Sequence, residues 1–215
     1  PDFPFPTREQ VIDRLGSQET LYPAESLFQY SNLALTLAGE IIQAQSGMPY
    51  DEYIQANILE PLGLDDTRTF YPEELAIGYT GIHRDGRRDP VEPFFTRGIT
   101  PAAGFTSSVN DLAAFASWQL RLLDKGGTEV LDANTLREMH RVHWLADDWS
   151  FGLGLSWFVA RKDDRTVISH SGSVPGFRTR IMAAPADDFG LIVLTNAGDS
   201  DVGKLSNQAW TMLAS

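Results

Sequence analysis

The chain has 215 residues, 42% of them hydrophobic and 21% charged, and its formal net charge is −12. This size and composition are ordinary for a globular protein of one or two domains. The negative charge argues against nucleic acid and anionic membranes as partners, because both are polyanions. The chain contains no cysteine, which excludes disulfides, zinc–thiolate sites and a cysteine nucleophile.

No apolar run approaches the ~18 residues that a membrane span needs. Residues 1–6 have neither the basic start nor the apolar centre of a signal peptide. The compartment therefore stays open, since an export signal could lie upstream of a fragment.

The first third of the chain is predicted to be helical. Thr7 and Gln10 form a capping-box pattern ahead of a short helix that ends at Gly16. The clearest helix runs from about Ser31 to Ser46, and a C-terminal glycine follows it. Its apolar face is carried by residues at helical spacing: Leu33, Leu37, Ile41 and Ala44.

Residues 64–104 are predicted to be irregular, with scattered glycines and prolines and a possible hairpin turn at Asp85-Gly86. A long connection of this kind often surrounds an active site. A capped helix is then expected from Ser108 to the Gly126-Gly127 pair, and another over about 134–143.

The last third of the chain changes character. Segments rich in Val, Ile, Phe and Trp predict strands over 151–160, 166–170, 178–184 and 191–196. Short polar turns between them suit antiparallel pairing, and a final helix is expected over about 204–213. Helices first, then an antiparallel sheet and one more helix, predict an α+β fold rather than a parallel sheet.

Two short motifs carry most of the chemistry. One is Tyr30-Ser31-Asn32, which opens the clearest helix, and the other is His170-Ser171-Gly172-Ser173, which ends a predicted strand. Three other segments surround them in a characteristic order: 39–42 (GEII), 58–67 (ILEPLGLDDT) and 101–113 (PAAGFTSSVNDLA). Together they resemble the superfamily of serine β-lactamases, penicillin-binding proteins and class C-like esterases. The Tyr-x-Asn element matches residues 30–32, and His170-Ser171-Gly172 stands where the family has Lys-Thr-Gly or His-x-Gly.

The family's nucleophile motif, Ser-x-x-Lys, is missing from the chain. Only three lysines are present, and the residues three positions before them are Leu122, Val159 and Asp201. Family members carry this motif ahead of the Tyr-x-Asn element. The resemblance therefore implies a β-lactamase/transpeptidase-like fold without its N-terminal strands and nucleophile helix. One incomplete catalytic domain is expected, with a mainly helical region over 1–145 and a sheet region over 146–215.

The resemblance also implies roles for the two motifs. Tyr30 would relay a proton from the nucleophile, and Asn32 would hold the motif lysine and the substrate oxygen. His170 would stand in the place of the motif lysine on the strand. The substrate and the oxyanion would lie along the rest of that motif: Ser171, Gly172 and Ser173.

The expected reaction is acyl transfer from an ester, amide or β-lactam carbonyl to a serine, followed by hydrolysis. Histidine in place of lysine favours esterases and peptidases over β-lactamases, because a permanent cation for the lactam carboxylate is lost. This chain alone is expected to be inactive, and no cofactor is implied. Its expected partners are a small substrate, the missing N-terminal segment, and a second copy of the chain across an exposed sheet edge.

Other interpretations remain open. The chain could be a non-catalytic binding or regulatory module on the same scaffold. Tyr30 could be a packed aromatic, with Ser31 or Asn32 as a plain helix cap, and His170 an ordinary strand histidine. A hydrolase that pairs Ser171 with His170 is disfavoured, because adjacent strand residues point to opposite faces. His140 and His143 could share a metal, but no third ligand is evident, and we expect a packed or solvated helix face.

Overall fold

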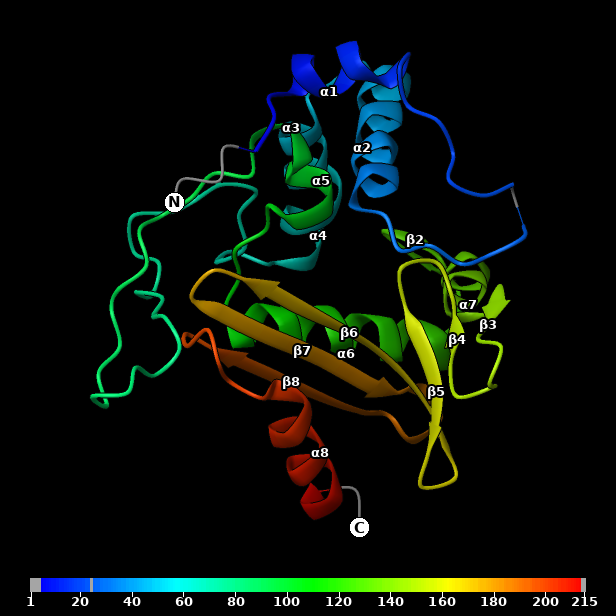
Figure 1. The fold of residues 1–215 in the computed structure, drawn as a ribbon. Coiled ribbons are helices and arrows are strands. Elements are labelled where there is room, and N and C mark those ends of the chain that lie inside the picture. The colour runs from blue at the N-terminus through cyan, green and yellow to red at the C-terminus, as the bar shows by residue number, and fades with distance from the viewer. Residues whose placement is uncertain (1–4, 24, 214–215) are drawn as a thin grey trace. The chain divides into compact units, whose positions relative to one another are not determined.

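The computed structural model describes residues 5–23 and 25–213 (Figure 1). Its internal contacts divide the chain into two compact units. The helical unit comprises Pro1–Leu75 and Pro93–Ser107, and the sheet unit comprises Ala76–Glu92 and Ser108–Ser215. The segregation of helices from an antiparallel sheet confirms the predicted α+β fold. The domain boundary after residue 145 stays a prediction, since these units interleave along the chain.

The helical unit is built from short helices and one long one. Its elements are α1 (Arg8–Leu15), α2 (Asn32–Ser46), α3 (Tyr50–Ile54), the π-helix η1 (Gln55–Leu59), α4 (Glu60–Leu62), the 3-10 helix η2 (Arg97–Ile99) and α5 (Thr100–Ala103). The predicted capping box is present, because the Thr7 side chain accepts from the Gln10 N–H while the Gln10 side chain accepts from the Thr7 N–H. Gly47 ends α2 at a φ of 72°, a left-handed conformation that favours glycine.

The sheet unit contains one six-stranded sheet in which neighbouring strands are antiparallel and follow chain order, β3-β4-β5-β6-β7-β8. The strands are β3 (Trp144–Leu145), β4 (Gly152–Leu153), β5 (Phe158–Lys162), β6 (Arg165–Val174), β7 (Phe177–Ala184) and β8 (Phe189–Thr195). The other elements are α6 (Val109–Lys125), the ribbon β1 (Thr128–Glu129) and β2 (Leu131–Asp132), α7 (Ala133–His140), η3 (Pro185–Asp187) and α8 (Val202–Leu213).

Helices α6 and α8 cover opposite faces of this sheet (Figure 1). On one face Leu120 of α6 packs in a buried cluster with strand residues: Val159, Ile168 and Ala183, together with Trp157. On the other face Trp210 of α8 is fully buried against Val167, Met182 and Ala184. Consecutive residues of β7, Ala183 and Ala184, thus reach the two opposite cores, as the period of two in a strand requires.

Two predicted elements differ from the structure. The expected strand over 151–160 is two strands, β4 and β5, joined by a tight turn in which the Gly154 N–H donates to the Trp157 carbonyl (2.8 Å). Ser156 takes a left-handed φ of 65° in this turn, which a continuous strand cannot contain. The expected helix over 134–143 ends at His140, because Arg141 is extended and leads into β3.

Within the described residues, the helices fall short of the length and apolar character that crossing a membrane would require.

Candidate active site

Tyr30, Ser31 and Asn32 lie at the start of α2 in the helical unit. The Ser31 side chain accepts a hydrogen bond from the Ala34 N–H (3.1 Å), so Ser31 is the N-cap of the helix. Asn32 is then the first helical residue and is exposed. Tyr30 is 50% exposed. The cap therefore fixes where the helix begins, and Tyr30 and Asn32 flank that point with accessible side chains.

Helix α2 exposes much of its apolar surface. Leu33, Leu35 and Ile41 are 37%, 41% and 62% exposed. The residues that α2 buries are Thr36 and Gly39. A Cβ at Gly39 would overlap the Pro101 ring, so the small residue is what lets α2 pack closely on α5. The predicted apolar stripe is thus largely uncovered in this unit.

His170, Ser171, Gly172 and Ser173 lie inside β6 in the sheet unit. The predicted strand ended at this motif, but β6 continues to Val174 and turns tightly into β7. His170 and Gly172 share the face of Ile168, whereas Ser171 and Ser173 lie on the opposite face. His170 and Ser171 therefore point apart, which counts against a mechanism that pairs them.

The His170 side chain is partly buried beside Phe158 of β5, with ring centroids 5.9 Å apart. Burial lowers the pKa of His170, and a hydrogen bond with the Ser171 backbone partly offsets this effect. The imidazole is consequently mainly neutral near pH 7.

Gly172 faces Thr179 across the β6–β7 ladder. A Cβ at position 172 would overlap the Thr179 hydroxyl, so glycine is required by the neighbouring strand. Sequence analysis missed Thr179, and no local signal identifies it, because the pairing depends on the register of two strands.

The motif end of β6 has one uncovered edge. Pairing with β5 stops at Phe158↔Ser169, so beyond Ser169 this side of β6 has no strand partner among the described residues. The Arg178 carbonyl accepts a hydrogen bond from Thr195 Oγ1 on β8 (3.1 Å). The N–H and C=O of one strand residue point to the same side of the strand, so both groups of Arg178 face β8. Ser173 is paired with Arg178, and its N–H and C=O therefore face away from β7. The Ser173 N–H is therefore directed to the uncovered edge.

A hairpin within residues 76–92 lies beside this end of the sheet. The predicted turn at Asp85-Gly86 is confirmed, since the Gly86 N–H donates to the His83 carbonyl and the His83 N–H to the Arg87 carbonyl. A Cβ at Gly78 would lie 2.6 Å from the Phe177 ring and 3.1 Å from the Gly176 Cα. Close backbone packing thus holds the hairpin against the β6–β7 turn.

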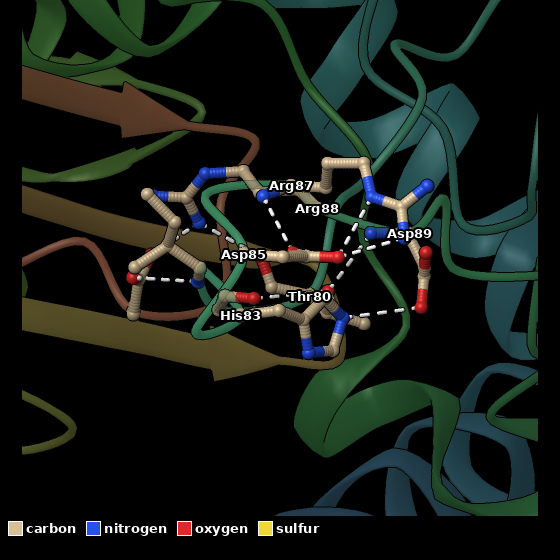
Figure 2. A network of polar contacts seen from close by, with 9 residues as sticks. Thr80, His83, Asp85, Arg87, Arg88 and Asp89 are labelled. Atoms are coloured by element: carbon tan, nitrogen blue, oxygen red, sulfur yellow. Dashed lines mark hydrogen bonds and ion pairs between the residues drawn. The ribbon is translucent and has the colours of Figure 1, made fainter.

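Polar contacts tie the same hairpin to the loop after β8 (Figure 2). The Arg88 guanidinium forms an ion pair with Asp199 and also donates to the Thr80 carbonyl (2.8 Å). The Ile82 N–H donates to the other Asp199 oxygen (3.0 Å). The hydrogen bond from Arg88 and, to a lesser extent, that from the Ile82 N–H lower the pKa of Asp199 to about 2. Sequence analysis missed this clamp, whose partners are 111 residues apart.

The two histidines that could have shared a metal are hydrogen-bonded to different partners, and only His140 lies on α7. His140 Nε2 is hydrogen-bonded to Gln119 Oε1 (2.8 Å), whereas His143 Nε2 contacts the Glu138 carbonyl (3.0 Å). Burial lowers the pKa of His140 to about 4. His140 is thus partly buried and packs edge to face on Trp157, in agreement with a packed helix face.

Comparison with known proteins matches this architecture to one family. The Beta-lactamase family model matches residues 1–212. Protein flp of Staphylococcus aureus (strain MW2) is 30% identical over 196 residues, which cover 89% of this chain and 37% of that protein.

Comparison with solved structures identifies the same fold. The octameric penicillin-binding protein homologue from Pyrococcus abyssi superimposes with a TM-score of 0.83 at 27% identity, covering 97% of this chain and 48% of that one. A class C beta lactamase from Rhodobacter sphaeroides has the same fold, with a TM-score of 0.78 at 20% identity, and the match covers 100% of this chain and 68% of that one.

The chain thus spans about 37% of the length of the curated relative it matches. The family match over nearly its whole length, the α+β fold and the order of the motifs agree with one another. This chain belongs to the Beta-lactamase family, within the superfamily of β-lactamases and penicillin-binding proteins.

Proposed function

We propose that this chain is the C-terminal part of a serine hydrolase that forms an acyl-enzyme on an ester, amide or β-lactam carbonyl. The observation that carries the proposal is the uncovered edge of β6, where the Ser173 N–H points outward beside the partly buried His170. A backbone N–H with a fixed direction in a strand is a preorganised donor for an oxyanion. The family membership supplies the class of chemistry.

The nucleophile and its lysine would come from a segment outside these 215 residues. The serine hydroxyl would attack the carbonyl carbon while its proton passes to Tyr30 or the lysine. The Ser173 N–H would donate to the oxyanion that forms, and Asn32 would orient the lysine and the substrate. Expulsion of the alcohol or amine, which takes up the proton, leaves the acyl-enzyme, and water then releases the acid.

An ester or amide fits the site better than an anionic β-lactam. His170 stands where the family's lysine would supply a permanent positive charge, and burial lowers the pKa of this histidine. A neutral imidazole near pH 7 can donate or accept one hydrogen bond but attracts a carboxylate weakly. The proposed substrate is therefore an uncharged ester or amide at the position that contacts His170.

We further propose that the missing segment packs on the apolar stripe of α2. Leu33 and Ile41 leave apolar side chains exposed along one face of this helix, and exposed apolar surfaces of this kind usually mark an interaction site. In the absence of that segment, the stripe and the β8 edge would favour self-association. The homologue from Pyrococcus abyssi is described as octameric, which supports assembly of copies as a further property.

The test is to express the complete protein that carries this chain and to measure its intact mass after reaction with a fluorophosphonate probe. One adduct is expected on a serine outside the 215 residues, and none on this chain alone. Tyr30→Phe should slow acylation by about 100-fold or more, whereas Tyr22→Phe, at another exposed tyrosine, should leave the rate unchanged. His170→Lys should shift preference from esters toward β-lactams.

Two results would contradict the proposal. A stoichiometric adduct within this chain would show that the nucleophile lies elsewhere. Retention of ligand binding without any adduct on the complete protein would favour the non-catalytic module.

A further inference from the structure

The helical unit contains a cavity of about 330 Å³, and its lining residues include none of the two sequence motifs. Its walls come from two segments far apart in the sequence, 69–71 and 94–106. Aromatic side chains dominate these walls: Phe70, Tyr71, Phe94, Phe95 and Phe105. A volume of this size is at the lower end of the range for small-molecule sites, which are mostly apolar with a few polar groups.

The aromatic side chains of the cavity are unusually accessible. Phe70, Phe95 and Phe105 are 59%, 63% and 42% exposed. Tyr71 and Phe95 pack edge to face, with ring centroids 6.2 Å apart, so the walls are held together rather than independently mobile. Three exposed phenylalanines around one cavity leave apolar surface that a ligand would remove from water.

Arg97 is the one cation in the cavity wall. It has a left-handed φ of 49°, a conformation that is unfavourable for a residue with a side chain. Contacts with Thr100 hold it there, since both the Thr100 Oγ1 (2.8 Å) and its N–H donate to the Arg97 carbonyl. The backbone is thus kept in a strained conformation by the turn that begins α5.

The Arg97 guanidinium has no acidic partner or hydrogen bond in the part of the chain that the structure describes, 5–23 and 25–213. Most arginines of the sheet unit, in contrast, pair with a carboxylate, as Arg88 does with Asp199. A planar guanidinium matches a carboxylate geometrically, because two parallel N–H groups can donate to its two oxygens.

We propose that this cavity binds a small carboxylate-bearing molecule with an aromatic or branched apolar body. The body would fill the space between Phe70, Phe95 and Phe105, and the carboxylate would pair with Arg97. The contacts with Thr100 keep the backbone of this lining residue in a fixed turn. The residues that line this cavity include neither Tyr30 nor His170, and binding there needs no nucleophile, so its test is separate from that of the proposed hydrolase activity.

The experiment is an NMR titration of the full 215-residue chain with 4-phenylbutyrate and, separately, with the uncharged 4-phenylbutanamide. The carboxylate should bind with a dissociation constant on the order of 1 mM, as expected for so small a ligand. The amide should bind at least about threefold more weakly, because the ion pair is lost.

Matched variants locate the binding. Arg97→Asn removes the cation, and asparagine tolerates the left-handed conformation, so the preference for the carboxylate should disappear while the fold, followed by circular dichroism, is retained. Arg84→Asn removes another exposed arginine, one that does not line the cavity, and should leave both affinities unchanged. Phe95→Ala should weaken both ligands about equally.

The proposal is overturned if neither ligand binds at a concentration about 10-fold above the expected dissociation constant of about 1 mM. It is also overturned if the carboxylate and the amide bind to the unmodified chain with equal affinity. It also fails if Arg84→Asn weakens the carboxylate as much as Arg97→Asn does, because the effect would then be general electrostatic attraction.

Discussion

The two units of this protein differ in how completely they bury their apolar residues. In the sheet unit, α6 and α8 cover opposite faces of the sheet, and Trp210, Met182 and Ala184 are at most 2% exposed. In the helical unit, the longest helix exposes Leu33 and Ile41 to solvent. Apolar residues at regular spacing therefore lie in a packed core in the sheet unit and on an exposed surface in the helical unit.

The difference has a physical cause. A sheet with a helix on each face removes both faces from water within one unit. A helix buries an apolar stripe only where another element lies against it, and α2 packs mainly through the small residues Thr36 and Gly39. The comparison teaches that the sheet unit covers both faces of its sheet from within, whereas the helical unit leaves apolar side chains of α2 exposed.

The largest effect is expected from Trp210→Ala in the sheet unit. Trp210 is fully buried and packs edge to face against Phe189, with ring centroids 4.9 Å apart. Its removal should lower the free energy of unfolding by about 3–5 kcal/mol, measured by urea denaturation. Trp149→Ala is the matched control, since Trp149 is 80% exposed and should change stability by less than about 0.5 kcal/mol. Equal losses for the two variants would refute the contrast between core and surface.

A smaller effect is expected from acid. Burial lowers the pKa of His140 to about 4, whereas an unfolded histidine titrates near pH ~6.5. Above pH ~6.5 the His140 side chain is neutral in both the folded and the unfolded chain. As the pH falls from about 6.5 to about 4, His140 binds a proton in the unfolded chain but not in the folded one. Stability should therefore fall across this window, by up to about 3 kcal/mol for the 2.5-unit difference between the two pKa values.

The burial of His140 explains the resistance to protonation. Its Nε2 is bonded to Gln119, and its Nδ1 is buried without a hydrogen-bond partner among the described residues, so a second N–H would have no acceptor there. Urea denaturation of His140→Gln at several pH values should show a flatter profile than the unmodified chain. His143→Gln is the control and should keep the steep profile; an identical flattening in both variants would point to a general charge effect.

The smallest change in stability is expected from Ile41→Lys in the helical unit. Ile41 is 62% exposed, so the free energy of unfolding should change by no more than about 0.5 kcal/mol. Sedimentation velocity should nevertheless show less self-association, because the charge interrupts the apolar stripe. Gln45→Lys on the same helix should leave association unchanged. Loss of the fold in Ile41→Lys would mean that the stripe is buried after all.

Much of the fold follows from local patterns. The capping box at Thr7, the cap at Ser31 and the glycine stop at Gly47 place α1 and α2 within a residue or two of their observed ends. These signals work because a cap satisfies backbone groups only a few residues away. The split between β4 and β5 escaped prediction, since a serine, Ser156, rather than a glycine takes the left-handed conformation in that turn.

In the candidate site too, some features follow from local sequence and others depend on strand pairing. Tyr30 and Asn32 are predictable as the start of a helix, and His170 to Ser173 as part of a strand. Their catalytic roles remain proposals. The direction of the Ser173 N–H and the contact of Gly172 with Thr179 depend on the pairing of β6 with β7, which a single strand does not specify.

The sequence by itself determined the α+β class, the helix boundaries set by caps, and the motifs that place this chain in its family. Those properties depend on residues within a few positions of one another. Only the tertiary structure decided which apolar faces are buried and which edge of β6 is open. It also decided that Arg88 pairs with Asp199, whereas Arg97 pairs with no acidic residue in the described part of the chain. Burial and pairing are set by whichever element packs alongside, and that neighbour can be more than 100 residues away in the chain.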